Sequence, residues 1–100
     1  MVKHIIMWDF PEGTSAQDQA ETAAAIKAAL EGLVGVIEGI VELSVHSELL
    51  GSSNAQLVLY SVFDSPEALL YYQDHPAHVK AATEVVRPNV TNRRCADFII

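Results

Sequence analysis

Hydrophobic residues recur along this chain with two periods, of about two and of three to four residues, which predict strands and helices respectively. Residues 2–10 alternate and predict a first strand whose two faces are both largely apolar. One face carries Val2, His4, Ile6, Trp8 and Phe10. The other carries Lys3, Ile5, Met7 and Asp9. A turn-forming triplet, residues 11–13, ends the strand.

A helical period follows, from residue 14 to about residue 33. Either Thr14 with Gln17 or Ser15 with Asp18 can form the capping box that starts this helix. The apolar positions at helical spacing are Ala23, Ile26, Leu30 and Leu33. Residues 20–29 are also rich in alanine, which has a high helix propensity. The sequence therefore predicts one long helix after the first strand.

Three more strands are predicted, over residues 36–49, 56–63 and 92–100. In the first of these, Val41, Leu43 and Val45 alternate with polar residues, as in a strand with one buried face. The clearest turn in the chain, GSSN at residues 51–54, separates it from the next strand, QLVLYSVF, which is apolar on both faces. The last strand, NRRCADFII, closes the chain.

A second helix, predicted to be bent, lies between the third and fourth strands. Ser65 can cap its start, and Pro66 suits the first helical turn. Pro76 lacks an amide hydrogen and pushes His75 away from helical geometry, so the helix must bend there. A second helical piece runs from Pro76 to about Val86.

The order strand–helix–strand–strand–helix–strand predicts an α+β domain over residues 1–100, with a ferredoxin-like antiparallel sheet and both helices on one face. That layout leaves the other face of the sheet without cover from its own chain. The apolar residues on this face are Ile5, Met7, Val58, Tyr60 and Val62. Because large exposed apolar patches mark interfaces, we expect a homodimer that packs sheet against sheet.

The formal net charge of −7 argues against nucleic acid as a partner, and it also disfavours a highly anionic ligand. No apolar run is long enough to cross a membrane. Residues 1–10 lack the features of a signal peptide, and the single cysteine, Cys95, excludes an internal disulfide. We therefore expect a cytoplasmic protein.

Titratable side chains concentrate at the helix bend, in YYQDHPAHV at residues 71–79. The bend lets Tyr72 and His78 approach each other, which a straight helix would prevent at a separation of six residues. Neutral His78 could take a proton from a carbon next to a carbonyl, and Tyr72 could donate a hydrogen bond to the developing enolate oxygen. His4 could orient the ligand from the sheet. The structural alternative is that His78 only hydrogen-bonds across the bend while Tyr72 packs beside it.

Three segments together resemble the Dabb family, the stress-responsive dimeric α/β-barrel domains. They are VKHIIMWDF at the start, SPEALLYYQDHPAHVKAATEVVRP in the middle and CADF near the end. The resemblance covers nearly the whole chain and implies a homodimer whose two sheets form a barrel-like core with the helices outside. Members of the family range from plant stress-associated proteins to a polyketide cyclase, olivetolic acid cyclase. Membership therefore implies the fold better than the function.

The resemblance to the cyclase implies an acid/base pair at Tyr72 and His78 and a pocket-lining His4, while His75 has a structural role. We expect a pocket for a small apolar molecule bearing a carbonyl or phenol group. Its apolar walls would be formed by Ile6, Trp8, Leu59 and Val79.

Other candidate chemistry is weaker. His4, His75 and His78 could bind a transition metal, but no carboxylate or cysteine has ligand spacing with them, so we expect no metal site. The chain has no phosphate-binding glycine loop, and we expect no cofactor. Cys95 and Trp8 are expected to fill the core. Arg93 and Arg94, the only basic doublet, are expected to pair with acidic side chains or face water.

Three functions stay open: small-molecule binding or catalysis, a non-catalytic stress-responsive dimer, and a monooxygenase of the related dimeric barrels.

Overall fold

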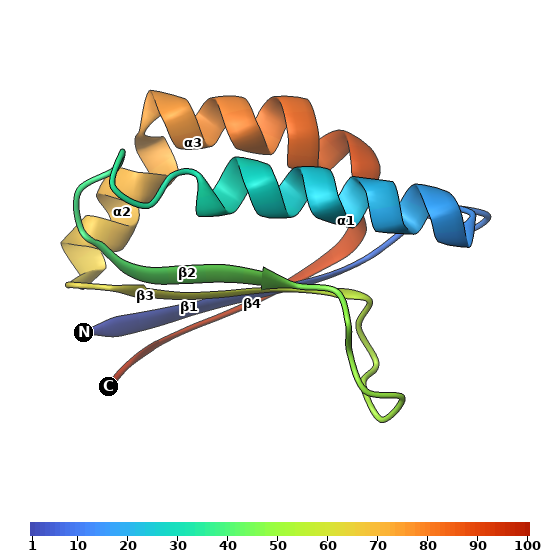
Figure 1. Ribbon diagram of the computed structural model, residues 1–100. Helices are drawn as coiled ribbons and strands as arrows, with labels where there is room; N and C mark the ends of the chain where they lie inside the picture. Colours follow the sequence, from blue (N-terminus) through green and yellow to red (C-terminus); the bar gives the residue numbers. More distant parts are fainter.

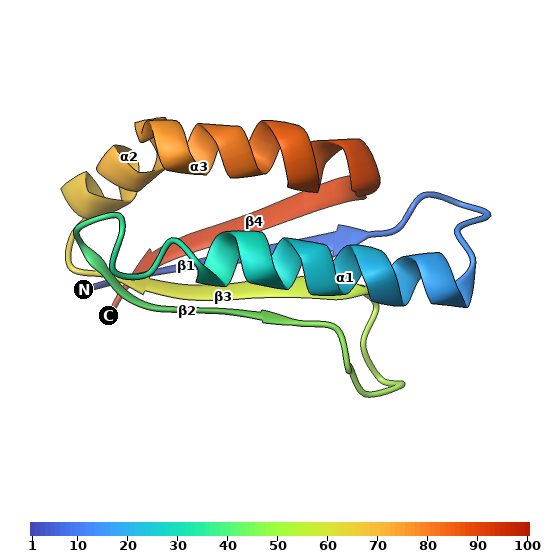
Figure 2. The same cartoon turned by 45° about the horizontal axis from the view of Figure 1, so that its top comes forward.

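Four antiparallel strands form one sheet, and the helices lie on one of its faces (Figures 1 and 2). The computed structural model describes residues 1–100. Its elements are β1 (Val2–Asp9), α1 (Ala16–Glu31), β2 (Ile40–His46), β3 (Leu57–Phe63), α2 (Pro66–Asp74), α3 (Pro76–Ala81) and β4 (Thr91–Ile99). The strand order β2-β3-β1-β4 confirms the predicted ferredoxin-like fold. None of the helices has both the length and the apolar character needed to cross a bilayer.

The first helix begins at the second of the two predicted caps. The side-chain oxygen of Ser15 accepts a hydrogen bond from the amide of Asp18, at 3.1 Å. The hydroxyl of Thr14 instead donates to the main-chain oxygen of Pro11. The helix ends at Glu31, two residues before the predicted end, but Leu33 is still buried in the core.

The bend in the second helical segment lies where Pro76 predicts it. His75 has an extended backbone and separates α2 from α3. Its Nδ1 atom accepts a hydrogen bond from the amide of Ala77, at 3.0 Å, so His75 caps α3 and has the structural role expected of it. After α3 the chain continues as a π-helical turn over Ala82–Val86 and a short 3₁₀ turn over Arg87–Asn89. The helical path therefore extends to Val86, as predicted.

The hydrophobic core fills the space between the sheet and the helices. Its most completely buried side chains include Ile6, Ile26, Leu57, Phe63 and Tyr72. Trp8 belongs to this core, as expected.

Strand β2 is shorter than predicted, and one of its residues does not follow the predicted pattern of burial: Val41 is 48% exposed. A register shift between Ile40 and Glu42 breaks the alternation there, while Leu43 and Val45 remain buried.

The opposite face of the sheet has no helix over it, and the loop between β2 and β3 projects beyond this face (Figure 1). Ile5, Met7, Val58 and Tyr60 are only partly buried there. Val62 was expected to share their exposure, but it is 5% exposed. Its cross-strand neighbours are the long side chains of Lys3 and Glu42, which shield it within the same chain.

Candidate functional site

A cavity of about 200 Å³ lies between the sheet and the bent helical segment. Its walls include His4, Ile6 and Trp8 from β1, Leu59 from β3, and Tyr72 and His78 from the two sides of the bend. Alternation along β1 and β3 turns these strand residues toward the helices, because they occupy the buried positions of each strand. The structure thus gathers around one space nearly all the residues that the sequence assigns to a pocket.

Val79 is the exception, and its predicted place in the pocket wall is wrong. It is 45% exposed and does not line the cavity. Successive residues of an α-helix point about 100° apart, so Val79 cannot share the direction of His78. Ala82 and Val86 form this part of the wall instead, because they follow His78 at intervals of about one turn.

Tyr72 is 1% exposed, yet its hydroxyl has no hydrogen-bond partner. Its ring packs against those of Phe63 and His78, with centroid separations of 4.8 and 4.2 Å. Burial raises the pKa of Tyr72 well above its usual value of 10.0, so the phenol keeps its hydrogen at any physiological pH. A buried hydroxyl without a partner is unfavourable, which makes Tyr72 a donor ready for a ligand oxygen.

His78 has a defined tautomer. Its Nδ1 atom lies 3.1 Å from the main-chain oxygen of Gln73. A carbonyl oxygen only accepts, so Nδ1 carries the hydrogen and Nε2 of the neutral ring is a free acceptor. Burial lowers the pKa of His78 below its ordinary value, and the nearby charge of Arg87 acts in the same direction, although the bond to Gln73 opposes them. His78 therefore does bond across the bend, as the structural alternative proposes, and still has a basic nitrogen available.

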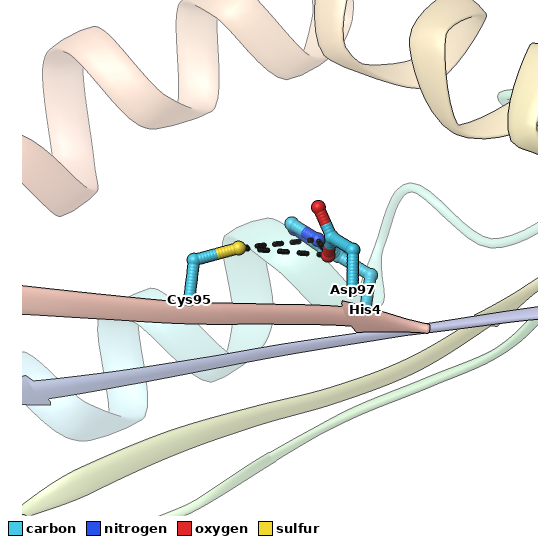
Figure 3. Close-up of side chains that lie close together, drawn as sticks. All are labelled: His4, Cys95 and Asp97. Carbon is cyan, nitrogen blue, oxygen red and sulfur yellow. Dashed lines mark hydrogen bonds and ion pairs between the residues drawn. The ribbon is translucent and has the colours of Figure 1, made fainter. Parts of the chain in front are cut away.

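His4 is held by a carboxylate that the sequence analysis did not single out. Its Nδ1 atom forms a short hydrogen bond with Oδ1 of Asp97, on the neighbouring strand β4 (Figure 3). The carboxylate accepts the Nδ1 hydrogen and so makes Nε2 the acceptor in the neutral ring. Asp97 lies directly opposite His4 in the antiparallel pairing of β4 with β1, and the alternation of β4 alone does not reveal that register.

Cys95 lies beside this pair, and its expected place in the core is wrong. It is exposed, because β4 is an edge strand. Its sulfur lies 3.5 Å from Oδ1 of Asp97 and 3.9 Å from Nδ1 of His4. Partial burial and the adjacent Asp97 carboxylate raise the pKa of the Cys95 thiol, which argues against a thiolate nucleophile.

His4, Cys95 and Asp97 form the group that could hold a metal ion, since their donor atoms lie within 4.8 Å of one another. Nitrogen, sulfur and carboxylate oxygen are all ligands of zinc. The set considered from sequence, His4 with His75 and His78, is not among the groups whose donor atoms come this close together. The three donors already hydrogen-bond among themselves, so the role their geometry supports best is to orient His4.

Two arginines also line the cavity, and the sequence analysis missed both. Arg87 follows the π-helical turn, and Arg93 lies on β4. Both are exposed, so they lie on the open side of the cavity. Neither forms an ion pair, in contrast to Arg94, whose guanidinium lies 2.9 Å from the carboxylate of Asp9. Both members of the doublet behave as expected in this respect, since Arg94 pairs with an acidic side chain and Arg93 is exposed, but the place of Arg93 at the cavity was not predicted.

Residues 2–100 match the family model of the stress responsive A/B barrel domain, Dabb. The chain belongs to the Dabb family. No curated protein matches the sequence. Solved structures, among them a Dabb family protein with a ferredoxin-like fold from Mesorhizobium loti, resemble it over almost its whole length.

One similar structure is a dimeric protein of unknown function with a ferredoxin-like fold from Bacteroides fragilis. It is 25% identical, with a TM-score of 0.89 and coverage of 99% of this chain and 95% of that one. A dimeric ferredoxin-like protein of unknown function from Thermobifida fusca is 23% identical, with a TM-score of 0.80 and coverage of 99% and 90%. A hydroxynitrile lyase from Passiflora edulis is 18% identical, with a TM-score of 0.74 and coverage of 99% and 92%. The last two likenesses show the shared fold alone.

Proposed function

We propose that this Dabb protein binds a small, largely apolar molecule bearing a carbonyl or phenol group and moves a proton on it. The observation that carries this proposal is the buried hydroxyl of Tyr72, which has no partner and lies at a cavity beside His78. A tightly closed interface between helices and sheet would have favoured the non-catalytic dimer instead. The fold is compatible with an enzyme, since a hydroxynitrile lyase shares it.

The roles follow from the hydrogens that each group carries. Tyr72 donates its hydroxyl hydrogen to the carbonyl oxygen of the bound molecule. Nε2 of His78, free because Nδ1 is bonded to Gln73, accepts a proton from the carbon next to that carbonyl. Negative charge then develops on the oxygen, where the bond from Tyr72 strengthens and stabilises the enolate. The reverse transfer returns the proton to carbon or to a second position of the molecule.

His4 serves as an anchor from the floor of the cavity. Asp97 fixes its ring, and the acceptor Nε2 is suited to a hydroxyl of the bound molecule. The apolar walls from Ile6, Trp8 and Leu59 exclude water from the rest of the bound molecule.

The test is exchange of carbon-bound hydrogen for deuterium, followed by NMR in heavy water. The probes are small ketones such as 4-hydroxyacetophenone, which carries a carbonyl, a phenol and exchangeable methyl hydrogens. The protein should accelerate exchange of at least one ketone, and His78→Ala should lower that rate by roughly 10²–10⁴, the usual contribution of a general base. Tyr72→Phe should lower it as well.

His46→Ala is the matched control, because His46 lies on β2, outside the cavity, and bonds only to Ser44. If no ketone of the series is exchanged and none shifts the NMR signals of His78, the proposal fails.

We infer in addition that a second copy of the chain covers the open face of the sheet. Relatives from Bacteroides fragilis and Thermobifida fusca are dimeric. The interface residues proposed here are Ile5, Met7, Val58 and Tyr60, which no part of their own chain covers fully. Val62 is left out, because it is already shielded.

We also propose a cytoplasmic location, since the exposed thiol of Cys95 fits a reducing compartment.

A further inference from the structure

Positive charge gathers at the cavity although the chain as a whole is acidic. The chain has six basic and thirteen acidic residues. Lys27 and Arg94 form ion pairs with Glu31 and Asp9. Arg87 and Arg93 form none, and both line the same cavity. Two guanidinium groups thus line one cavity, and neither is paired with a carboxylate in a chain that has thirteen acidic residues.

Local charge decides what such a cavity accepts. At physiological ionic strength, exposed charges separated by more than about 8 Å are largely screened from one another. Acidic side chains beyond that distance therefore have little effect on the field at the cavity, and none of the acidic side chains forms an ion pair with Arg87 or Arg93. Asp97, which lies beside the cavity, is engaged by His4 and Cys95. The acidic net charge of the whole chain therefore does not exclude a ligand with one negative charge from this cavity.

We infer that the molecule bound for the proposed proton transfer, on which this assignment rests, is a small carboxylate. Its anionic group binds Arg87 and Arg93 at the open side of the cavity, and its carbonyl or phenol oxygen lies at Tyr72 deeper inside. A guanidinium presents paired donors that match a carboxylate in shape as well as in charge.

The size of the cavity limits the rest of the molecule. Its volume of about 200 Å³ is below the roughly 300–1,000 Å³ of sites that bury a drug-sized ligand. The inner walls are apolar or aromatic, from Ile6, Trp8, Leu59 and Tyr72. A single ring or a short keto chain with one carboxylate fits this description, whereas a long acyl chain does not.

The experiment compares two probes of nearly the same size and shape, the anion 4-hydroxybenzoate and the neutral 4-hydroxybenzamide. Binding is measured by titration calorimetry, and the NMR signals of His78 report whether each probe enters the cavity. The benzoate should bind about tenfold more tightly than the amide, the lower end for a hydrogen-bonded charge, because both arginines are partly in water. Added salt should weaken the binding of the benzoate and leave the binding of the amide unchanged.

Arg87→Gln and Arg93→Gln should each reduce the preference for the benzoate, and the double variant should remove it. Arg94→Gln is the matched control. It lies next to Arg93 in sequence but on the other face of β4, where it pairs with Asp9. Its loss should leave the preference intact.

Equal binding of the two probes to the unmodified protein would overturn the assignment of a carboxylate, as would an equal effect of the Arg93 and Arg94 variants. In that case the amide still shifts the His78 signals, and the proposed proton transfer stands. If neither probe shifts them, the carboxylate assignment fails, and the proposed proton transfer stands or falls by the exchange of the ketones alone.

Discussion

His78 donates its Nδ1 hydrogen to the main-chain oxygen of Gln73, at 3.1 Å, across the bend that Pro76 creates. The bend therefore does more than bring His78 close to Tyr72. It exposes a carbonyl that the next turn of a continuous helix would have used, and this carbonyl selects the tautomer of the histidine. Backbone geometry and proton chemistry are coupled at this one hydrogen bond.

The first prediction concerns pH. Burial lowers the pKa of His78 below 6.5, so the ring is neutral at pH 7 and stays neutral into mildly acidic solution. Because only the neutral ring accepts a proton, the exchange rate should fall as the pH drops through that lowered pKa. Burial raises the pKa of Tyr72 above 10.0, so the rate should stay level on the alkaline side up to at least pH 9. A pH–rate profile with its acid limb at or above pH 6.5 would contradict this assignment.

The second prediction is that Tyr72→Phe stabilises the protein while it weakens function. The change removes a buried hydroxyl that has no partner, which should raise the free energy of unfolding by about 1 kcal/mol. Thermal and urea denaturation measure this effect. Tyr71→Phe is the control, because the Tyr71 side chain is more than half exposed and its loss of a hydroxyl should leave stability unchanged. A clear loss of stability in Tyr72→Phe would mean that the hydroxyl has a structural partner.

The third prediction concerns the carboxylate behind His4. Asp97→Ala should release Nδ1 of His4 and let the ring exchange between tautomers, which ¹⁵N NMR of the imidazole detects. Binding of phenolic probes should weaken several-fold, whereas the melting temperature should change little, because Asp97 is exposed. Asp74→Ala, at an exposed position of α2, should change neither measurement. An unaltered tautomer in the Asp97 variant would show that the hydrogen bond does not control His4.

The fourth prediction concerns the bend itself. Pro76→Ala restores an amide hydrogen and allows His75 to adopt helical geometry, so α2 and α3 can merge or shift. The melting temperature should change modestly, while binding of any ketone that the unmodified protein exchanges should weaken strongly. Pro66→Ala is the control, because Pro66 is at the first position of α2, where an amide hydrogen has no helical partner. Unchanged affinity for the ketone in the Pro76 variant would show that the bend has no role in positioning the residues of the site.

The fifth prediction concerns assembly. Val58→Asp should give a monomer or an aggregate, because the new charge would be buried without a partner between two sheets. Light scattering at micromolar concentration distinguishes these outcomes from a dimer. Val36→Asp, in the exposed loop after α1, should leave the protein dimeric by the same measurement. A folded monomer of the unmodified protein would contradict the proposed interface.

Much of the fold follows from local patterns that act over a few residues. The caps at Ser15 and Ser65, the break at Pro76 and the alternation along β1 each depend on chemistry within one turn or one strand. Val41 and Val62 depart from expectation because their exposure depends on neighbouring strands. A register shift turns Val41 outward, and cross-strand neighbours cover Val62. Neither effect is visible in the pattern of a single strand.

The candidate site divides in the same way. Tyr72 and His78 are close in sequence, so the bend between them was enough to predict their meeting. Asp97 and Arg93 approach the cavity from β4, and Arg87 approaches it from the short turn before β4. The placement of Asp97 and Arg93 depends on the pairing of β4 with β1, whose register follows from contacts across the whole domain. Residue types alone gave these three charged side chains no distinguishing feature.

The pairing of β1 with β4 joins the two ends of the chain, which lie side by side in Figure 2. His4 and Asp97 are 93 residues apart, and the amide of Ile100 bonds to the main-chain oxygen of Met1, at 3.0 Å. During synthesis β1 leaves the ribosome before β4, and its edge stays open until β4 emerges. A nascent chain can therefore assemble its helices and its β2–β3 hairpin early, while the cavity is completed only after β4 has been made. A premature stop that removes β4 would take Arg93 away from the cavity and leave β1 as an unpaired edge strand.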